Sequence, residues 1–166
     1  ALGAVYEGRG DVSNAKKNYD ASLVLSPTYG PAIRGNANLL LKEGKLPEAL
    51  SYIKRIQEKY PDAVDPVVEL ARLKIDDGKF EEAISDSKQA LLKEERNIDA
   101  KLNIAKSYYH LGKYELSLYV VDNIVDITDF SHDAYFLKGL CLKALDRRQA
   151  ALIAYRNAVD IRQDFP

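Results

Sequence analysis

The sequence predicts an all-α solenoid of about five helix-turn-helix repeats, and three observations support this prediction. Glycines recur with a constant spacing of 34 residues. Each glycine opens a similar six-residue phrase that ends on a small residue, such as GKLPEA and GKFEEA. Apolar residues on both sides of these glycines recur every three to four positions, which is the spacing of an amphipathic helix. The repeated glycines are Gly10, Gly44, Gly78 and Gly112.

Each of these glycines is expected to join the two helices of one repeat, because glycine suits the turn at a helix C-terminus. One further step of 34 residues reaches Asp146, which opens a fifth phrase, DRRQAA. Ten helices are therefore predicted, over residues 1–9, 13–25, 31–43, 47–59, 66–77, 81–93, 99–111, 115–127, 133–145 and 149–161.

Two columns of small residues follow the same period and predict close contact between paired helices. The column in the first helices contains Gly3, Ala37, Ala71, Ala105 and Gly139. The second helices carry an alanine or serine early in each segment. The first helices also share a start signal, since Asp65 precedes Pro66 as an N-cap residue precedes proline at the first helical position. Asp99 and Asp133 follow at the same period and are predicted to be N-caps as well.

The repeats are predicted to form one array over residues 1–166. The first repeat should begin about five residues before Ala1, and the last predicted helix carries more apolar surface than its partner helix can cover. Together with the absence of any methionine, this leads us to expect a piece of a longer or processed protein. The repeat boundaries fall at residues 1–29 (incomplete), 30–63, 64–97, 98–131 and 132–165.

The 34-residue period and its small-residue columns resemble the tetratricopeptide repeat family, and the resemblance covers essentially the whole chain. It implies a right-handed solenoid whose first helices line a concave groove, acting as a non-catalytic scaffold for protein binding. The second repeat departs from the family pattern at Asn36, where a large apolar residue is usual. The first repeat shows the pattern in full, with Leu2, Gly3, Tyr6, Gly10, Ala15, Tyr19, Ser22 and Pro27.

Composition argues against several classes of partner. Lys plus Arg number 24 and Asp plus Glu 25, which gives a net charge of −1. The chain therefore lacks the excess of positive charge that would attract nucleic acid or an anionic membrane. RNA-binding helical repeats also use a different period, usually 35, and a strongly basic groove. No stretch approaches 18 consecutive apolar residues, so direct membrane insertion is not expected.

Catalytic and metal-binding roles are not expected, and neither is a cofactor. The chain has one cysteine and two histidines. Cys141 lies inside a predicted helix and is interpreted as a small buried hydrophobe. His110 has no nucleophile beside it in the sequence, and His132 falls at a predicted helix start. A single cysteine fits the cytosol and the bacterial periplasm or envelope equally, so the compartment stays open.

The predicted binding site is a concave groove with a basic and polar stripe beside an apolar one. Residues 34 positions apart should occupy equivalent places, so Arg72 and Lys106 are expected along one wall, where they are not needed for folding. The same rows continue to Leu140 and Lys143. The expected ligand is a protein or peptide segment with acidic and apolar residues. The predicted partner-binding residues are Arg34, Asn38, Lys42, Val68, Arg72, Leu102, Lys106, Tyr109 and Phe136.

One tetratricopeptide subfamily grips the carboxylate tail of chaperones, and the sequence argues against that activity here. Arg34 and Asn38 resemble the first basic and asparagine pair of that clamp. The next repeat carries Glu69 where a further asparagine is expected, and the following one carries Asp99 and Asn103 where basic residues are expected.

Two alternatives remain open beside the peptide-binding scaffold. The array could serve self-association, as a homo-oligomer built through apolar surface on its terminal helices. It could also be the recognition arm of a larger enzyme or of a secretion or motility complex. The stretch KQALLKEERNIDAKLNIAKSYYHLGKYELS resembles arrays in bacterial envelope proteins linked to gliding motility or outer-membrane assembly.

Overall fold

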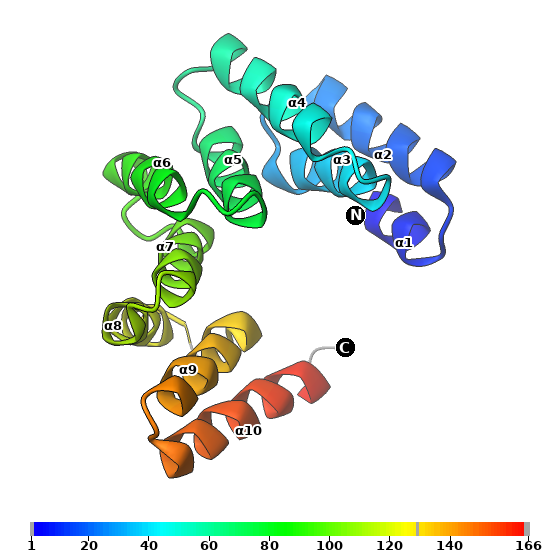
Figure 1. Cartoon of the computed structure of the whole chain (residues 1–166). Helices are drawn as coiled ribbons and strands as arrows, with labels where there is room; N and C mark the ends of the chain where they lie inside the picture. The colour runs from blue at the N-terminus through cyan, green and yellow to red at the C-terminus, as the bar shows by residue number, and fades with distance from the viewer. Residues whose placement is uncertain (1, 129, 165–166) are drawn as a thin grey trace. The chain divides into compact units, whose positions relative to one another are not determined.

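The computed structural model describes residues 2–128 and 130–164, and within this range the regular structure is entirely helical. Every predicted helix is present, with boundaries within three residues of those expected, which confirms an all-α fold of about five helix-turn-helix repeats (Figure 1). The ten helices of the described range are α1 (Leu2–Gly8), α2 (Val12–Leu25), α3 (Gly30–Lys42), α4 (Leu46–Lys59), α5 (Val64–Asp76), α6 (Phe80–Lys93), α7 (Ile98–His110), α8 (Tyr114–Val125), α9 (His132–Ala144) and α10 (Arg148–Asp164).

The chain divides into two compact units, Ala1–Asp77 and Gly78–Pro166. The first unit contains α1 to α5, and the second contains α6 to α10. Within the units, the first helix of a repeat packs against both helices of the preceding repeat. Helix α3 contacts α1 and α2, α5 contacts α3 and α4, and α9 contacts α7 and α8. A single array over residues 1–166 stays a prediction.

The turns within the repeats explain the glycine column. Gly10, Gly44, Gly78 and Gly112 all adopt φ between 71° and 77°. In this left-handed region a Cβ atom crowds the following carbonyl oxygen, so glycine is favoured there. Asp146, one period after Gly112, has φ of 57° and is the one non-glycine residue with positive φ in the described range.

Replacing Asp146 with glycine should therefore raise the free energy of unfolding by roughly 0.5–1 kcal/mol. The ion pair from Arg148 Nε to Asp146 Oδ1, at 2.8 Å, is lost, but both side chains are at least 80% exposed and such pairs contribute little. Urea unfolding followed by circular dichroism measures the change. Asp146→Ala is the matched control and should be destabilising, because alanine keeps the crowded Cβ and loses the polar side chain that eases this conformation. A glycine variant no more stable than the native chain would contradict the prediction.

The small residues of the first-helix column are buried in tightly packed surroundings, in agreement with the predicted close contact between helices. Ala37, Ala71 and Ala105 are completely buried. Gly139 packs beneath the ring of Tyr155, and a Cβ atom added there would lie 2.4 Å from Tyr155 Cδ1. This position therefore requires glycine for steric reasons, although its helical backbone suits any residue.

Cys141 is fully buried in the core of the second unit, in agreement with its interpretation as a small hydrophobe. Its Sγ donates to Ser117 Oγ at 3.1 Å, and Ser117 Oγ donates to the carbonyl oxygen of Ala105 at 2.8 Å. These two bonds connect α9, α8 and α7. Burial raises the pKa of the Cys141 thiol, which keeps it in the unreactive protonated form.

The predicted N-caps were wrong by two residues. The residues that precede α5, α7 and α9 are Ala63, Asn97 and Ser131, and the three aspartates occupy the second helical position. Asn97 and Ser131 cap their helices by accepting from the backbone N–H groups of Ala100 and Ala134. Asn and Ser share the capping chemistry of Asp, so the nearest aspartate was a misleading signal.

Candidate protein-binding surfaces

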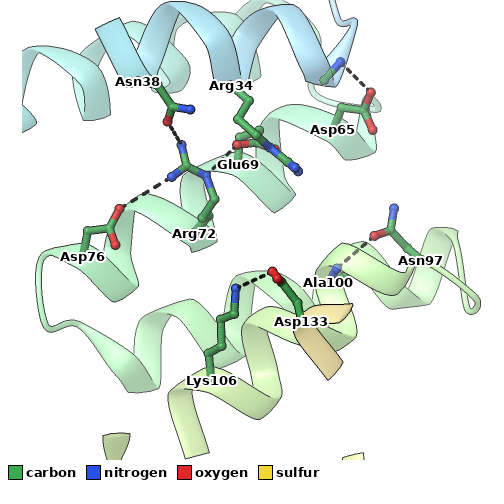
Figure 2. Close-up of polar contacts among 11 residues, drawn as sticks. Arg34, Asn38, Asp65, Glu69, Arg72, Asp76, Asn97, Ala100, Lys106 and Asp133 are labelled. Atoms are coloured by element: carbon green, nitrogen blue, oxygen red, sulfur yellow. Dashed lines mark hydrogen bonds and ion pairs between the residues drawn. The ribbon is translucent and has the colours of Figure 1, made fainter. Parts of the chain in front are cut away.

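A buried carboxylate organises the polar stripe of the first unit. Glu69 on α5 has only 2% of its side chain exposed. Its Oε1 accepts from Arg34 Nε on α3 at 2.7 Å, and its Oε2 accepts from Arg72 Nε at 2.9 Å. Figure 2 shows the two guanidinium groups converging on this carboxylate. Both oxygens of a buried anion are thus occupied by cations from neighbouring repeats.

Arg72 holds two further groups in place. Its Nη2 donates to Asn38 Oδ1 on α3 at 3.1 Å, and its Nη1 lies 3.6 Å from Asp76 Oδ2 (Figure 2). Arg72 pairs with the buried Glu69 and connects α5 to α3, so it has structural contacts that the sequence analysis did not expect. The sequence does contain a signal for this pairing, since Arg34 and Glu69 are opposite charges one repeat plus one residue apart.

The same offset appears at the start of α3. The backbone N–H of Gly30 donates to Asp65 Oδ2 at 2.8 Å, so an aspartate of the third repeat satisfies the first N–H of a helix in the second (Figure 2). A Cβ at position 30 would lie 2.7 Å from that oxygen, which explains the glycine. Asp65 therefore has a capping role, but for α3 instead of its own helix.

Lys42 lies in a separate cluster with α1 and α2. Its Nζ is 2.8 Å from Glu7 Oε1, while Tyr19 donates its hydroxyl to Glu7 Oε2 at 2.6 Å. Burial opposes ionisation of Glu7, but the hydrogen bonds from Lys42 and Tyr19 outweigh it and hold the pKa of Glu7 below its usual range. Burial, together with the bond to Glu7, raises the pKa of Tyr19 to about 12. Lys42 thus connects the first two repeats, with 57% of its side chain still exposed.

In the second unit, the predicted binding residues on α7 already contact neighbouring side chains of the chain itself. Lys106 Nζ lies 3.3 Å from Asp133 Oδ2 of α9, and both side chains keep at least 40% exposure (Figure 2). The half-buried ring of Tyr109 lies against Tyr114, with ring centroids 5.5 Å apart. His110 stacks on Phe80 at 5.0 Å.

The three predicted apolar contacts differ sharply in exposure. Val68 and Leu102 are 3% and 7% exposed, whereas Phe136 is 48% exposed. Val68 and Leu102 therefore contribute mainly to packing within the repeats. Phe136 alone among the three offers a large apolar surface to a partner.

Phe136 lies in a cavity of about 900 Å³ between α9 and α10, here called the α9–α10 groove. The ring of Tyr155 lies 5.8 Å from that of Phe136, and two exposed cations, Lys143 and Arg162, also line the groove. His132 joins its two helices, because its Nδ1–H donates to the carbonyl oxygen of Ala158 at 2.8 Å. The lining residues are His132, Phe136, Leu140, Lys143, Tyr155, Ala158, Val159 and Arg162.

Of the residues in this groove, the sequence analysis had placed Phe136, Leu140 and Lys143 in its rows of equivalent positions. They missed Tyr155, Val159 and Arg162, because the predicted groove was assigned to first helices alone. A periodic signal for the missed residues does exist. Their equivalents one repeat earlier, on α8, form the wall against which α9 packs.

The residues that the structure describes contain neither a cluster that could hold a metal ion nor a membrane-spanning helix. No group of three or more His, Cys, Asp or Glu residues among them could hold a metal ion. None of the helices in residues 2–128 and 130–164 is long and apolar enough to cross a membrane.

Comparison with protein families and solved structures gives concordant results. Two family models described as tetratricopeptide repeat match residues 68–132 and 132–165, together more than half of the chain. The structure of TTC0263 from Thermus thermophilus is similar, with a TM-score of 0.77 and 19% identity over 98% of this chain and 93% of that one. No curated protein matches the sequence.

Two further structures show the same fold. YrrB, described as a tetratricopeptide repeat protein with an unusual peptide-binding site, has a TM-score of 0.63 and 17% identity over 98% of this chain and 84% of its own. MamA from Desulfovibrio magneticus has a TM-score of 0.64 and 20% identity over 80% of this chain and 75% of that one.

Proposed function

Because the chain belongs to the tetratricopeptide repeat family, whose members are generally non-catalytic protein-interaction scaffolds, we propose that it binds a protein segment in the α9–α10 groove. The observation that supports this proposal most directly is the exposed ring of Phe136, which lies with the partly buried Tyr155 and the exposed Lys143 and Arg162 in one cavity. Concave, mainly apolar sites with a few polar groups are the usual form of a binding site.

The chemistry of the groove selects a segment with apolar and acidic residues. Phe136 and Tyr155 form an aromatic floor that would bury an apolar anchor, and buried aromatic contacts dominate many interfaces. Lys143 and Arg162 would attract carboxylates and raise the association rate. Since both cations are exposed, their contribution should weaken with salt, and the affinity should be modest, about micromolar.

The remaining predicted contacts take supporting roles in this proposal. Lys106 and Tyr109 lie on α7 of the same unit and would extend the surface beyond α9. In the first unit, Arg34, Asn38 and Arg72 form a polar face and Lys42 lies in a separate cluster, and the cations of both are already paired with Glu69, Asp76 and Glu7. An acidic partner would have to compete with these internal carboxylates, so this face should bind more weakly than the groove.

Replacing Phe136 with alanine should lower the affinity for groove ligands about tenfold, the loss typical of an interface anchor. The ligands come from a random peptide display library selected against the native chain, and we expect them to combine Asp or Glu with Leu or Phe. Isothermal titration of selected peptides measures the change. Tyr119→Ala is the matched control, because Tyr119 is 69% exposed on α8 of the same unit and lies outside the groove.

Circular dichroism should show that both variants keep their helical content. Selected peptides that bind the Phe136→Ala variant as tightly as the native chain would contradict the proposed site. Peptides without acidic residues would contradict the role of the two cations.

Self-association is a second candidate function, supported by exposed apolar residues on α10. Leu152 and Ile153 are 68% and 62% exposed. Because they are adjacent in the helix, they expose more apolar surface together than a single isolated side chain does. Static light scattering over a concentration series distinguishes the two functions, since a monomer at high concentration excludes self-association. A role as the recognition arm of a larger complex is compatible with either function.

A further inference from the structure

A second cavity lies in the first unit, between the second helices α2 and α4. Helix α3 packs against both of them, and the space of about 550 Å³ that they leave between them is here called the α2–α4 pocket. Its size is that of a ligand site, which is typically about 300–1,000 Å³. The walls include Asp20 and Val24 from α2, Tyr52, Arg55 and Lys59 from α4, and Tyr60 at the end of α4.

Further repeats of the array leave this kind of position uncovered. In the first unit, α5 packs on α3 and α4 and does not contact α2. In the second unit, the equivalent positions lie between α6 and α8, with α9 and α10 following, and between α8 and α10, with α6 preceding. Among the described helices, only α7 contacts both α6 and α8, and only α9 contacts both α8 and α10. An occupant of the α2–α4 pocket therefore has to come from outside the array.

Asn36 of α3 places a polar group beside this pocket, at the position where the repeat pattern usually has a large apolar residue. Its equivalents Leu70 and Ile104 are buried, and Asn36 itself is only 6% exposed. The Asn36 Nδ2 donates to Asp20 Oδ1 at 2.9 Å and to Tyr52 Oη at 3.3 Å. Its Oδ1 is buried without a donor from the described residues. A buried amide costs stability relative to an apolar residue, so we expect it to serve the two pocket side chains that it holds.

The α4 wall of the pocket offers two cations that are not neutralised by the chain. Arg55 and Lys59 lie one turn apart, and both are exposed. Neither forms an ion pair with a residue that the structure describes, and Lys59 Nζ lies 5.4 Å from the ring centroid of Tyr60. Their equivalents in the fourth repeat are Asn123 and Ile127. The repeat fold itself therefore does not need cations at these two positions.

The polar groups of the pocket favour a peptide over a phosphate. Arg55 and Lys59 can only donate hydrogen bonds. Burial raises the pKa of Tyr52, so its hydroxyl keeps its proton and can donate as well. Asp20 on the facing helix accepts, and its negative charge would repel a phosphate. A peptide segment offers both a backbone N–H for Asp20 and a carboxylate for the cations, while Val24, at 82% exposure, provides apolar surface.

We propose that the α2–α4 pocket binds a partner protein through a short segment in which an acidic residue follows a large apolar one. The carboxylate would lie between Arg55 and Lys59, the apolar side chain would cover Val24 and Tyr60, and a backbone N–H would donate to Asp20. This surface belongs to the other unit from the α9–α10 groove, so the inference goes beyond the proposed function and does not depend on it.

Short peptides with acetylated and amidated ends test the inference, because a glutamate is then their only charge. The sequences are Ser-Phe-Glu-Ser and its matched control Ser-Phe-Gln-Ser. Each is titrated at low salt into the isotope-labelled 166-residue chain and followed by NMR. The glutamate peptide should shift the signals of Tyr52, Ile56 and Tyr60 and bind about fivefold more tightly than the glutamine peptide. Added salt should reduce this difference.

A double substitution in the chain tests the two cations. Arg55→Gln with Lys59→Gln should remove the preference for the glutamate peptide. Lys17→Gln with Lys54→Gln is the matched control and should keep the preference, because it removes the same charge from exposed positions of α2 and α4 outside the pocket. Circular dichroism should show the same helical content for both double variants.

Asn36→Leu tests the positioning role of the buried amide. It restores the kind of residue found at Leu70 and Ile104, so the melting temperature should stay the same or rise. The glutamate peptide should nevertheless bind about threefold more weakly, because Asp20 and Tyr52 lose the group that holds them. Asn36 with a purely structural role would give a lower melting temperature and unchanged binding, which would contradict this part of the inference.

The remaining outcomes overturn the inference and leave the proposed function to its own test. They include equal binding of the two peptides, no shift at the pocket, and an undiminished preference in the Arg55 and Lys59 variant. Shifts confined to Phe136, Tyr155 and Val159 would place the peptide in the α9–α10 groove alone. Equal shifts with inorganic phosphate would assign the cations to a phosphate, and shifts on concentrating the chain without peptide would assign the pocket to a second copy.

Discussion

Replacing Ala105 with leucine is expected to lower the free energy of unfolding by about 1–3 kcal/mol, the usual cost of overpacking a core. Ala105 on α7 is completely buried, and its carbonyl oxygen accepts the bond from Ser117 on α8. Cys141 of α9 joins the same chain of hydrogen bonds. Three added carbons must therefore push apart helices that these bonds hold together. Thermal unfolding followed by circular dichroism measures the loss.

Ala150→Leu is the matched control for this substitution. Ala150 is an exposed residue of α10 in the same unit, so the same added carbons should change stability by less than about 0.5 kcal/mol. An unchanged melting temperature for Ala105→Leu would contradict the close pairing of α7 with its neighbours.

Replacing Glu69 with alanine is expected to cost about 2 kcal/mol. The substitution removes the buried carboxylate that Arg34 and Arg72 share. The two guanidinium groups then lie close together with no anion between them. The full penalty of an unpaired buried charge is not expected, because the two arginine side chains are 40% and 25% exposed and can regain water. Urea unfolding measures the change, and Glu69→Gln should lie between alanine and the native residue.

Glu95→Ala is the control for the charge removed. Glu95 is exposed in the turn between α6 and α7, and its loss should change stability by less than about 0.5 kcal/mol. Similar effects of the two alanine substitutions would show that the Glu69 network does not stabilise the first unit. In that case Arg72 would be available to serve a ligand.

The polar stripe shows why the candidate site could be predicted only in part. The sequence places Arg34, Asn38 and Arg72 on one face, because residues one period apart occupy equivalent positions in a repeat. Whether a cation is available to a ligand depends on the carboxylate that lies beside it. Glu69 pairs with Arg34 across a separation of 35 residues, so comparing residues exactly one period of 34 apart does not bring the two together, although their opposite charges one residue off that period are a signal.

Two large apolar residues also show that the availability of a side chain depends on its neighbours in the fold. Leu102 and Phe136 occupy equivalent places in α7 and α9, and the sequence assigned both as anchors. Helix α9 helps to bury Leu102, whereas Phe136 remains half exposed. Exposure is a property of the neighbouring helices, so it is invisible in a column of equivalent residues.

The sequence by itself determined the number of helices in the described range, their boundaries within three residues, and the turns that join them. These features depend on local chemistry, namely helical apolar spacing and the positive φ adopted at Gly10, Gly44, Gly78 and Gly112. Only the tertiary structure decided which charges are neutralised and which apolar side chains remain exposed. Ion pairing and burial depend on distances between helices, and those distances arise when residues from different repeats pack together.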